Sequence, residues 1–104
     1  MTRGVDALLQ DSDVTPLELV ERHLSGDFGI HGRFAEIEVT DEELRDGPLA
    51  TADDGKLNKA AILQDEIGQW QGRILSAYIV NDERVWIITE ADRSATTLLL
   101  PEEY

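Results

Sequence analysis

Three apolar runs near the end of the chain decide the fold: RILSAYIV (73–80), VWIITE (85–90) and ATTLLL (95–100). All three are rich in β-branched, aromatic and leucine side chains, a composition that favours strands. They are separated by NDER (81–84) and ADRS (91–94), whose Asn, Asp and Ser side chains are typical of turns. Three consecutive strands joined by short turns predict an antiparallel β-meander.

The central strand of this meander is apolar on both of its faces. Val85, Trp86, Ile87 and Ile88 follow one another without a polar residue. Since successive side chains of a strand point to opposite faces, both faces of the sheet are expected to be at least partly covered. Helices should therefore pack on at least one of them.

Two main helices are predicted before the meander. TPLE (15–18) offers a capping threonine, a proline suited to the first turn and a glutamate that can complete a capping box. A helix is therefore expected over residues 16–25, ending at Gly26. Strong helix formers fill residues 54–67 and predict a second helix with Asp54 as its N-cap.

Shorter elements complete the expected α+β fold. Residues 5–10 predict a helical turn. TDEE (40–43) repeats the capping-box pattern that begins with Thr40 and predicts another turn, which ends before Pro48. Apolar and acidic residues alternate in FAEIEV (34–39), which is typical of a short edge strand. We expect a single domain over residues 1–104, with two main helices packed on an antiparallel sheet of three or four strands. The expected core comprises Leu17, Val20, Leu24, Leu57, Ala61, Ile74, Tyr78, Trp86, Ile88 and Leu99.

The charge of the chain limits its classes of partner. Of 104 residues, 22 are Asp or Glu and 9 are Lys or Arg, which gives a net charge of −13. A field of that sign repels phosphate backbones, so direct binding to nucleic acid is not expected. The same field attracts a basic surface on another protein, although acidity also serves solubility alone.

Features that the sequence lacks indicate the compartment in which the protein is expected to act. The chain has no cysteine, which removes thiolate chemistry and indicates a reducing cytoplasm. Residues 1–6 lack the apolar region of a signal peptide, and no apolar run approaches the roughly 18 residues that cross a bilayer. We expect no membrane association and no cofactor. A homodimer through an exposed edge strand or an apolar sheet face stays open.

Several stretches resemble one family. RILSAY (73–78) and residues 85–104 are similar to uncharacterised small bacterial proteins, some of them labelled plasmid-related. GDFG (26–29) is similar to the family's Gly-Asp-Trp-Gly turn, with Phe28 in place of Trp, and DGKLN (54–58) matches its Asp-x-x-x-Asn helix start. The resemblance implies a mobile-element setting and marks residues 30–53 as an insertion, but it implies no activity.

The first candidate site is an acidic segment that lies almost entirely in this insertion. From Glu36 to Asp54 the chain has eight acids and one base, Arg45. Such a run is usually a solvated surface, and the alternative is a strip that mimics a phosphate backbone for a basic partner. No histidine or lysine lies beside the paired carboxylates to support acid–base catalysis. The candidate binding residues are Glu36, Glu38, Asp41, Glu42 and Glu43.

The second candidate site is the turn that joins the last two strands. Here Arg93 could hold an anionic group bidentately, with Glu90, Asp92 and Thr96 beside it to orient the group. The alternative is that Asp92 and Ser94 bond to their own turn and that Arg93 pairs with Glu90. No nucleophile with an adjacent base is present, so no catalytic residue is assigned.

The histidines do not predict a metal site. His23, Asp27 and His31 are too loosely spaced, and His23 is expected to face solvent or to cap the end of its helix. A contact between Asp27 and Asn58 is expected to hold the glycine-rich turn against the second helix.

These observations favour a non-enzymatic protein-binding module that acts through its acidic surface on a basic partner. A regulator or inhibitor carried by a mobile element fits that description. The alternative is a small-molecule-binding or hydrolytic domain that uses the polar turn at residues 90–97.

Overall fold

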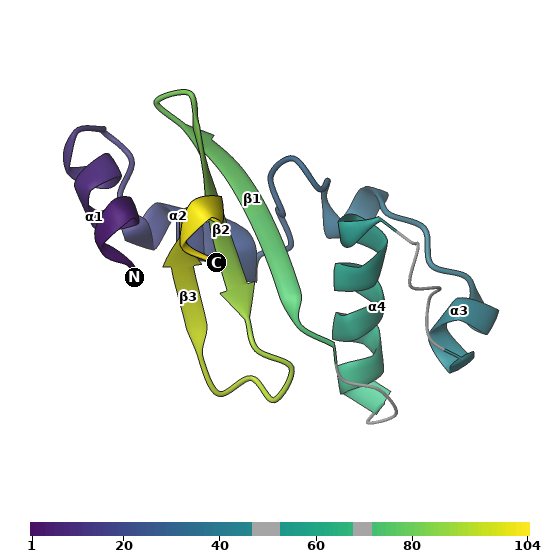
Figure 1. The fold of residues 1–104 in the computed structure, drawn as a ribbon. Helices are drawn as coiled ribbons and strands as arrows, with labels where there is room; N and C mark the ends of the chain where they lie inside the picture. The colour runs from purple at the N-terminus through teal and green to yellow at the C-terminus, as the bar shows by residue number, and fades with distance from the viewer. Residues whose placement is uncertain (47–52, 68–71) are drawn as a thin grey trace.

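The three predicted strands form the sheet. In the computed structural model, which describes residues 1–46, 53–67 and 72–104, the strands β1 (Ile74–Val80), β2 (Glu83–Thr89) and β3 (Thr96–Leu99) pair antiparallel in that order (Figure 1). The register places Trp86 between Ala77 and Leu99. Asn81 and Asp82 both have positive φ, as a two-residue hairpin turn requires. The meander and the α+β class are confirmed.

Helical elements lie on both sides of β1 in the view of Figure 1. The helices are α1 (Arg3–Gln10), α2 (Pro16–Leu24), α3 (Asp41–Asp46) and α4 (Asp54–Ile67), with single 3₁₀ turns η1 (Phe34–Glu36) and η2 (Pro101–Glu103). In the view of Figure 1, α1 and α2 lie to the left of β1, whereas α4 runs beside β1 on its right and α3 lies beyond α4. Within the described ranges, no helix is long and apolar enough to cross a bilayer.

The predicted helix caps form, with one shift. Thr15 Oγ1 accepts a hydrogen bond from the Glu18 amide at 3.2 Å, and Gly26 closes the helix with φ of 88°. For α4, the cap is Asp53 rather than the expected Asp54, because Asp53 Oδ1 accepts from the Lys56 amide at 2.8 Å. Asp54 is instead the first residue of the helix.

The main core lies between α1, α2 and one face of the sheet. Of the expected core residues, Ala61, Tyr78, Ile88 and Leu99 are buried, and Val20, Leu57, Ile74 and Trp86 are half-buried. The largest buried cluster comprises Val5, Leu9, Leu19, Tyr78, Val80, Val85, Ile87, Leu98 and Leu100.

Two leucines that were expected in the core lie outside it. Leu17 is 65% exposed and Leu24 is 73% exposed. Helix α2 instead turns Leu19 and His23 inward, at 1% and 4% exposure. A polar histidine can take this position because two strand hydroxyls bond to its ring, as described below.

The expected fourth strand at residues 34–39 does not form. Phe34–Glu36 is the 3₁₀ turn η1, Ile37 after it is extended, and residues 37–40 form no regular secondary structure. Lys59 Nζ of α4 donates to the carbonyl oxygens of Phe34 and Ile37, at 2.8 and 2.7 Å. The backbone acceptors of this segment are therefore bonded by a lysine instead of a neighbouring strand.

The outer edge of β1 is closed by two different partners. The Ala77 amide donates to the Phe28 carbonyl at 3.1 Å, and the Ile30 amide donates to the Ala77 carbonyl at 2.9 Å. Two residues earlier on the same edge, Asn58 Nδ2 donates to the Leu75 carbonyl at 2.6 Å, and the Leu75 amide donates to Asn58 Oδ1 at 2.8 Å. Asn58 is 1% exposed, so its side-chain amide replaces the peptide group of a neighbouring strand.

Gly29 permits the close approach of this turn to β1. A Cβ atom on Gly29 would lie 1.9 Å from the Ala77 carbonyl oxygen, and its φ is 68°. Both the contact and the backbone conformation therefore require glycine.

Replacing Asn58 with alanine should destabilise the fold. The substitution removes both bonds to Leu75 and leaves a backbone donor and acceptor unpaired, so we expect a loss of about 2 to 3 kcal/mol in the free energy of unfolding. Urea denaturation followed by circular dichroism measures this loss. The control is Gln10→Ala, which removes an exposed side-chain amide bonded to Asp6 and should change stability little. Equal stability of the two variants would contradict the role of Asn58.

Candidate functional site

One end of the molecule gathers the acidic side chains of residues 36–54. We define the acidic end as η1, the residues that follow it, α3 and the first turn of α4. Glu43 completes a capping box with Thr40: the Glu43 amide donates to Thr40 Oγ1 at 3.1 Å and the Thr40 amide donates to Glu43 Oε1 at 3.3 Å. The exposed acids of this end are Glu36, Glu38, Asp41, Glu42, Asp53 and Asp54.

The two lysines of α4 at this end both bond to groups of the same chain. Lys56 Nζ lies 3.1 Å from Glu43 Oε2, and the hydrogen bond from Lys56 holds the pKa of the Glu43 carboxyl below its usual value. Lys59 Nζ bonds two carbonyls and lies 4.6 Å from the centre of the Phe34 ring. The lysines therefore fix α3 and η1 to α4, while the six acids named above are exposed.

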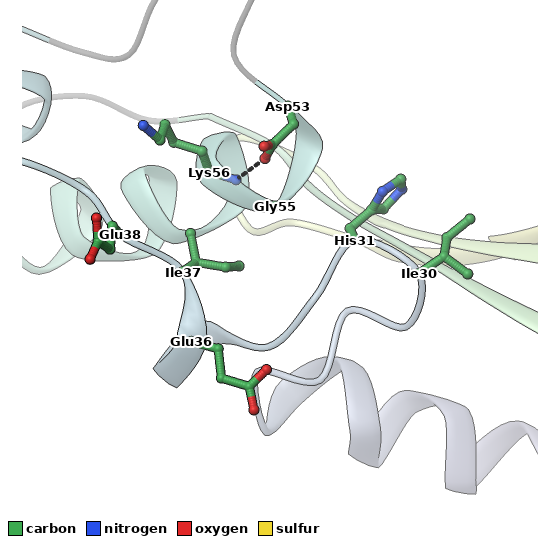
Figure 2. A pocket seen from close by; sticks show the side chains of 8 residues that line it. All are labelled: Ile30, His31, Glu36, Ile37, Glu38, Asp53, Gly55 and Lys56. Carbon is green, nitrogen blue, oxygen red and sulfur yellow. Dashed lines mark hydrogen bonds between the residues drawn. The ribbon is translucent and has the colours of Figure 1, made fainter.

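A hollow of about 460 Å³ lies between η1 and the start of α4. Figure 2 shows Ile37 between the two glutamates that flank it, with Glu36 and Glu38 pointing in different directions and the Lys56 ammonium pointing away from Ile37. Apolar area from Ile37 and the half-exposed Ile30 therefore lies beside an acidic rim. The lining residues are Ile30, His31, Glu36, Ile37, Glu38, Asp53, Gly55 and Lys56.

Close packing joins the turn before η1 to α4. A Cβ atom on Gly55 would lie 2.2 Å from the His31 carbonyl oxygen, so only glycine fits there. His31 Nε2 lies 3.7 Å from Asp54 Oδ2, too far for a hydrogen bond. Across the residues that the structure describes, no group of three or more His, Cys, Asp or Glu side chains is arranged to hold a metal ion.

In the second candidate site, the turn between β2 and β3, Asp92 and Thr96 bond to groups of the same turn and of the strand before it. The Ser94 amide donates to Asp92 Oδ1 at 3.0 Å, and the Ser94 side chain and amide lower the pKa of the Asp92 carboxyl. Thr96 Oγ1 lies 2.9 Å from Thr89 Oγ1. These contacts agree with the turn alternative for Asp92, whereas Glu90 is exposed.

Arg93 directs its guanidinium at backbone carbonyls. Nη1 donates to Gly72 at 2.7 Å and to Glu90 at 3.1 Å, and Nη2 donates to Ala61 of α4 at 3.4 Å. Arg93 thus bonds to the carbonyl of Glu90 and links the turn to α4. The anion-binding role of Arg93 stays a prediction, and this geometry favours a structural role.

A buried polar cluster centred on His23 was not predicted. His23 was expected in solvent or at a cap, but its Nδ1 lies 2.6 Å from Ser76 Oγ and its Nε2 lies 2.8 Å from Thr89 Oγ1. Burial lowers the pKa of His23 to about 4, which keeps the ring neutral. The Ser76 and Thr89 side chains point to the face of the sheet that α2 covers. The alternation of side chains along each strand was the sequence feature that could have placed these two hydroxyls on that face.

Asp27 and Asn58 both lie near the outer edge of β1, but they bond to different partners. Asp27 Oδ2 accepts from Arg22 Nε at 2.8 Å and Oδ1 accepts from the Gly29 amide at 3.1 Å, and the bond from Arg22 lowers the pKa of the Asp27 carboxyl. Asn58 bonds to Leu75 instead. The expected direct contact is replaced by these two arrangements, both of which are structural.

Comparisons with protein-family models, with curated proteins and with solved structures found no match to this chain. The resemblance to plasmid-related bacterial proteins therefore stays a prediction. Function has to be argued from the geometry and charge of the chain itself.

The buried His23 should make stability depend on pH. The ordinary pKa is 6.5 and the folded-state pKa is about 4, so between these values the unfolded chain binds a proton that the folded chain does not. Stability is therefore lost as the pH falls from 6.5 toward 4, by about 2.5 kcal/mol at pH 4.5. Urea unfolding of the wild type and of His23→Gln at pH 7 and pH 4.5 measures the effect.

The variant serves as the control because all other titrating groups are common to both chains. The stability advantage of the wild type over His23→Gln should shrink by about 2.5 kcal/mol between the two pH values. An advantage that does not change with pH would show that His23 is not held neutral.

Proposed function

We propose that the chain is a non-enzymatic protein-binding module whose acidic end binds a basic surface of another protein. One observation carries the proposal: Lys56 and Lys59 are bonded to the chain itself, while six acids of this end are exposed, namely Glu36, Glu38, Asp41, Glu42, Asp53 and Asp54. The local field is therefore negative where the surface is exposed. Such a field steers a basic partner and selects against acidic ones.

The hollow supplies a second element of a protein interface. Ile30 and Ile37 give it apolar area, and Glu36 and Glu38 lie at its rim. Protein interfaces commonly combine an apolar centre with a polar, solvent-accessible rim. A basic side chain of the partner can lay its methylene groups on the isoleucines and its charge against the carboxylates.

The diverging carboxylates support binding over catalysis. In Figure 2 the Glu36 and Glu38 side chains point in different directions, so they do not form a pair that could share a proton or a substrate. General acid–base catalysis requires groups within hydrogen-bond reach of one reacting atom. The arrangement of this end suits a surface that meets charges distributed over a partner.

In this proposal the partner is a protein whose basic surface otherwise binds nucleic acid. The chain would compete for that surface in the cytoplasm as a regulator or inhibitor. The resemblance to plasmid-related bacterial proteins supports a mobile-element setting.

Neutralising four carboxylates of the acidic end should reduce capture of the partner tenfold or more. The test variant combines Glu36→Gln, Glu38→Gln, Asp41→Asn and Glu42→Gln. The control removes four charges elsewhere, with Asp11→Asn, Asp13→Asn, Asp82→Asn and Glu83→Gln. Each immobilised chain is exposed to a bacterial lysate, and bound proteins are quantified by mass spectrometry at low salt and at tenfold higher salt.

We expect the wild type and the control to bind a basic protein at low salt. The amount of this protein that is bound should fall tenfold or more with the test variant, or with the wild type at high salt. A bound set that is unchanged by the four substitutions at the acidic end, or by the rise in salt, would contradict the proposal.

A further inference from the structure

Helix α2 carries an exposed apolar seam. Leu17 and Leu24 are 65% and 73% exposed, and Val20 between them is only partly buried against the core. Their spacing of three and four residues is the a–d–a spacing of a coiled-coil heptad. The α2 seam is defined here as Leu17, Val20 and Leu24, and over seven residues of helix it extends about 10 Å.

The fold itself does not require this seam. The inward side of α2 is filled by Leu19 and His23, and the start of the helix is secured by the Thr15 cap. Single exposed leucines are ordinary in proteins. Two leucines aligned along one stripe, on either side of a partly buried valine, instead form a continuous apolar surface that a second helix can cover.

The flank of the α2 seam is acidic. Glu18 and Glu21 are exposed, and together with Arg22 and Ser25 they line a shallow hollow of about 440 Å³. Arg22 is bonded to Asp27 at 2.8 Å, and its guanidinium lies over the Tyr78 ring at 4.6 Å. The charge on this flank that is free to meet a partner therefore comes from the two glutamates, in a chain whose net charge is −13.

We propose that the α2 seam docks an amphipathic α-helix of a partner protein, with apolar residues in heptad spacing and Lys or Arg at the flanking positions. Flanking charges of opposite sign set partner choice in coiled coils. A second copy of this chain is a poorer occupant, because it would bring the same glutamates together. In the view of Figure 1, α2 and the acidic end lie on different sides of β1, although Arg22 of α2 and Glu36 of η1 line one hollow beside that strand. The α2 seam shares no residue with the acidic end, so the two proposals can be tested separately.

Selection from a library of helical peptides tests the proposal. The library keeps Leu, Ile or Val at the a and d positions and varies Lys, Arg, Glu and Gln at the flanking positions. The full chain is the bait, and affinities of the selected peptides are measured by fluorescence anisotropy. The test variant is the double substitution Leu17→Ser and Leu24→Ser. The control is Ile79→Ser, which removes an apolar side chain on β1 that is 55% exposed.

Selected peptides should carry Lys or Arg at the flanks, and the double variant should weaken their binding at least tenfold while the control changes it less than twofold. All variants should keep the wild-type melting temperature within a few degrees, because the replaced side chains are largely exposed. The variant with four substitutions at the acidic end should still bind these peptides. Failure of this proposal can therefore be told apart from failure of the proposed function.

Three results would overturn the proposal. The first is a selection that yields no peptide preferring the wild type to the double variant. The second is enrichment of acidic flanks. The third is a dimer of the wild type by light scattering that is lost in the double variant, because the occupant of the α2 seam would then be a second copy.

Discussion

The closure of the outer edge of β1 is the constraint on which the rest of the structure depends. An edge strand presents peptide groups that must be bonded or hydrated. Here the side chain of Asn58 bonds both groups of Leu75, and the backbone of Phe28 and Ile30 bonds both groups of Ala77. Phe28 and Ile30 precede the acidic segment and Asn58 follows it. The same strand therefore anchors the segment at both of its chain ends.

This anchoring explains how an acidic segment can present a defined surface. Self-repulsion among its carboxylates would favour an extended chain. The bonds from Lys59 to the carbonyls of Phe34 and Ile37 and from Lys56 to Glu43 oppose that tendency and direct both lysine charges at the chain itself. On the other side of β1, α2 displays leucines and glutamates. In the two proposals, the first surface binds a basic partner through charge around a hollow and the second through a helical seam.

The sequence predicted those features that depend on neighbouring residues. The meander, the Thr15 and Thr40 caps and the end of α2 at Gly26 follow from local composition and turn chemistry. The inward side of α2 did not follow from the helix sequence alone, because the choice between Leu17 and Leu19 depends on the strand hydroxyls that bond to His23. The expected strand at residues 34–39 failed for a similar reason, since Lys59 bonds the carbonyls that a strand would have used.

The candidate site was predictable to the same extent. The concentration of acids between Glu36 and Asp54 is plain in the sequence, but the direction of the two lysines depends on how α3 and η1 pack against α4. Likewise, the composition of the β2–β3 turn suggested an anion site. Only the tertiary structure shows the Arg93 guanidinium bonded to carbonyls of its own turn and of α4.

Amide hydrogen exchange along β1 tests the central claim most directly. The Leu75 and Ala77 amides face the outer edge, and by strand alternation so does the Ile79 amide, which lies beyond Phe28 and Ile30. Edge closure predicts that Leu75 and Ala77 exchange about a hundredfold more slowly than Ile79. Exchange of all three amides at the same fast rate would show that the edge is open and that the acidic end is not anchored to the sheet.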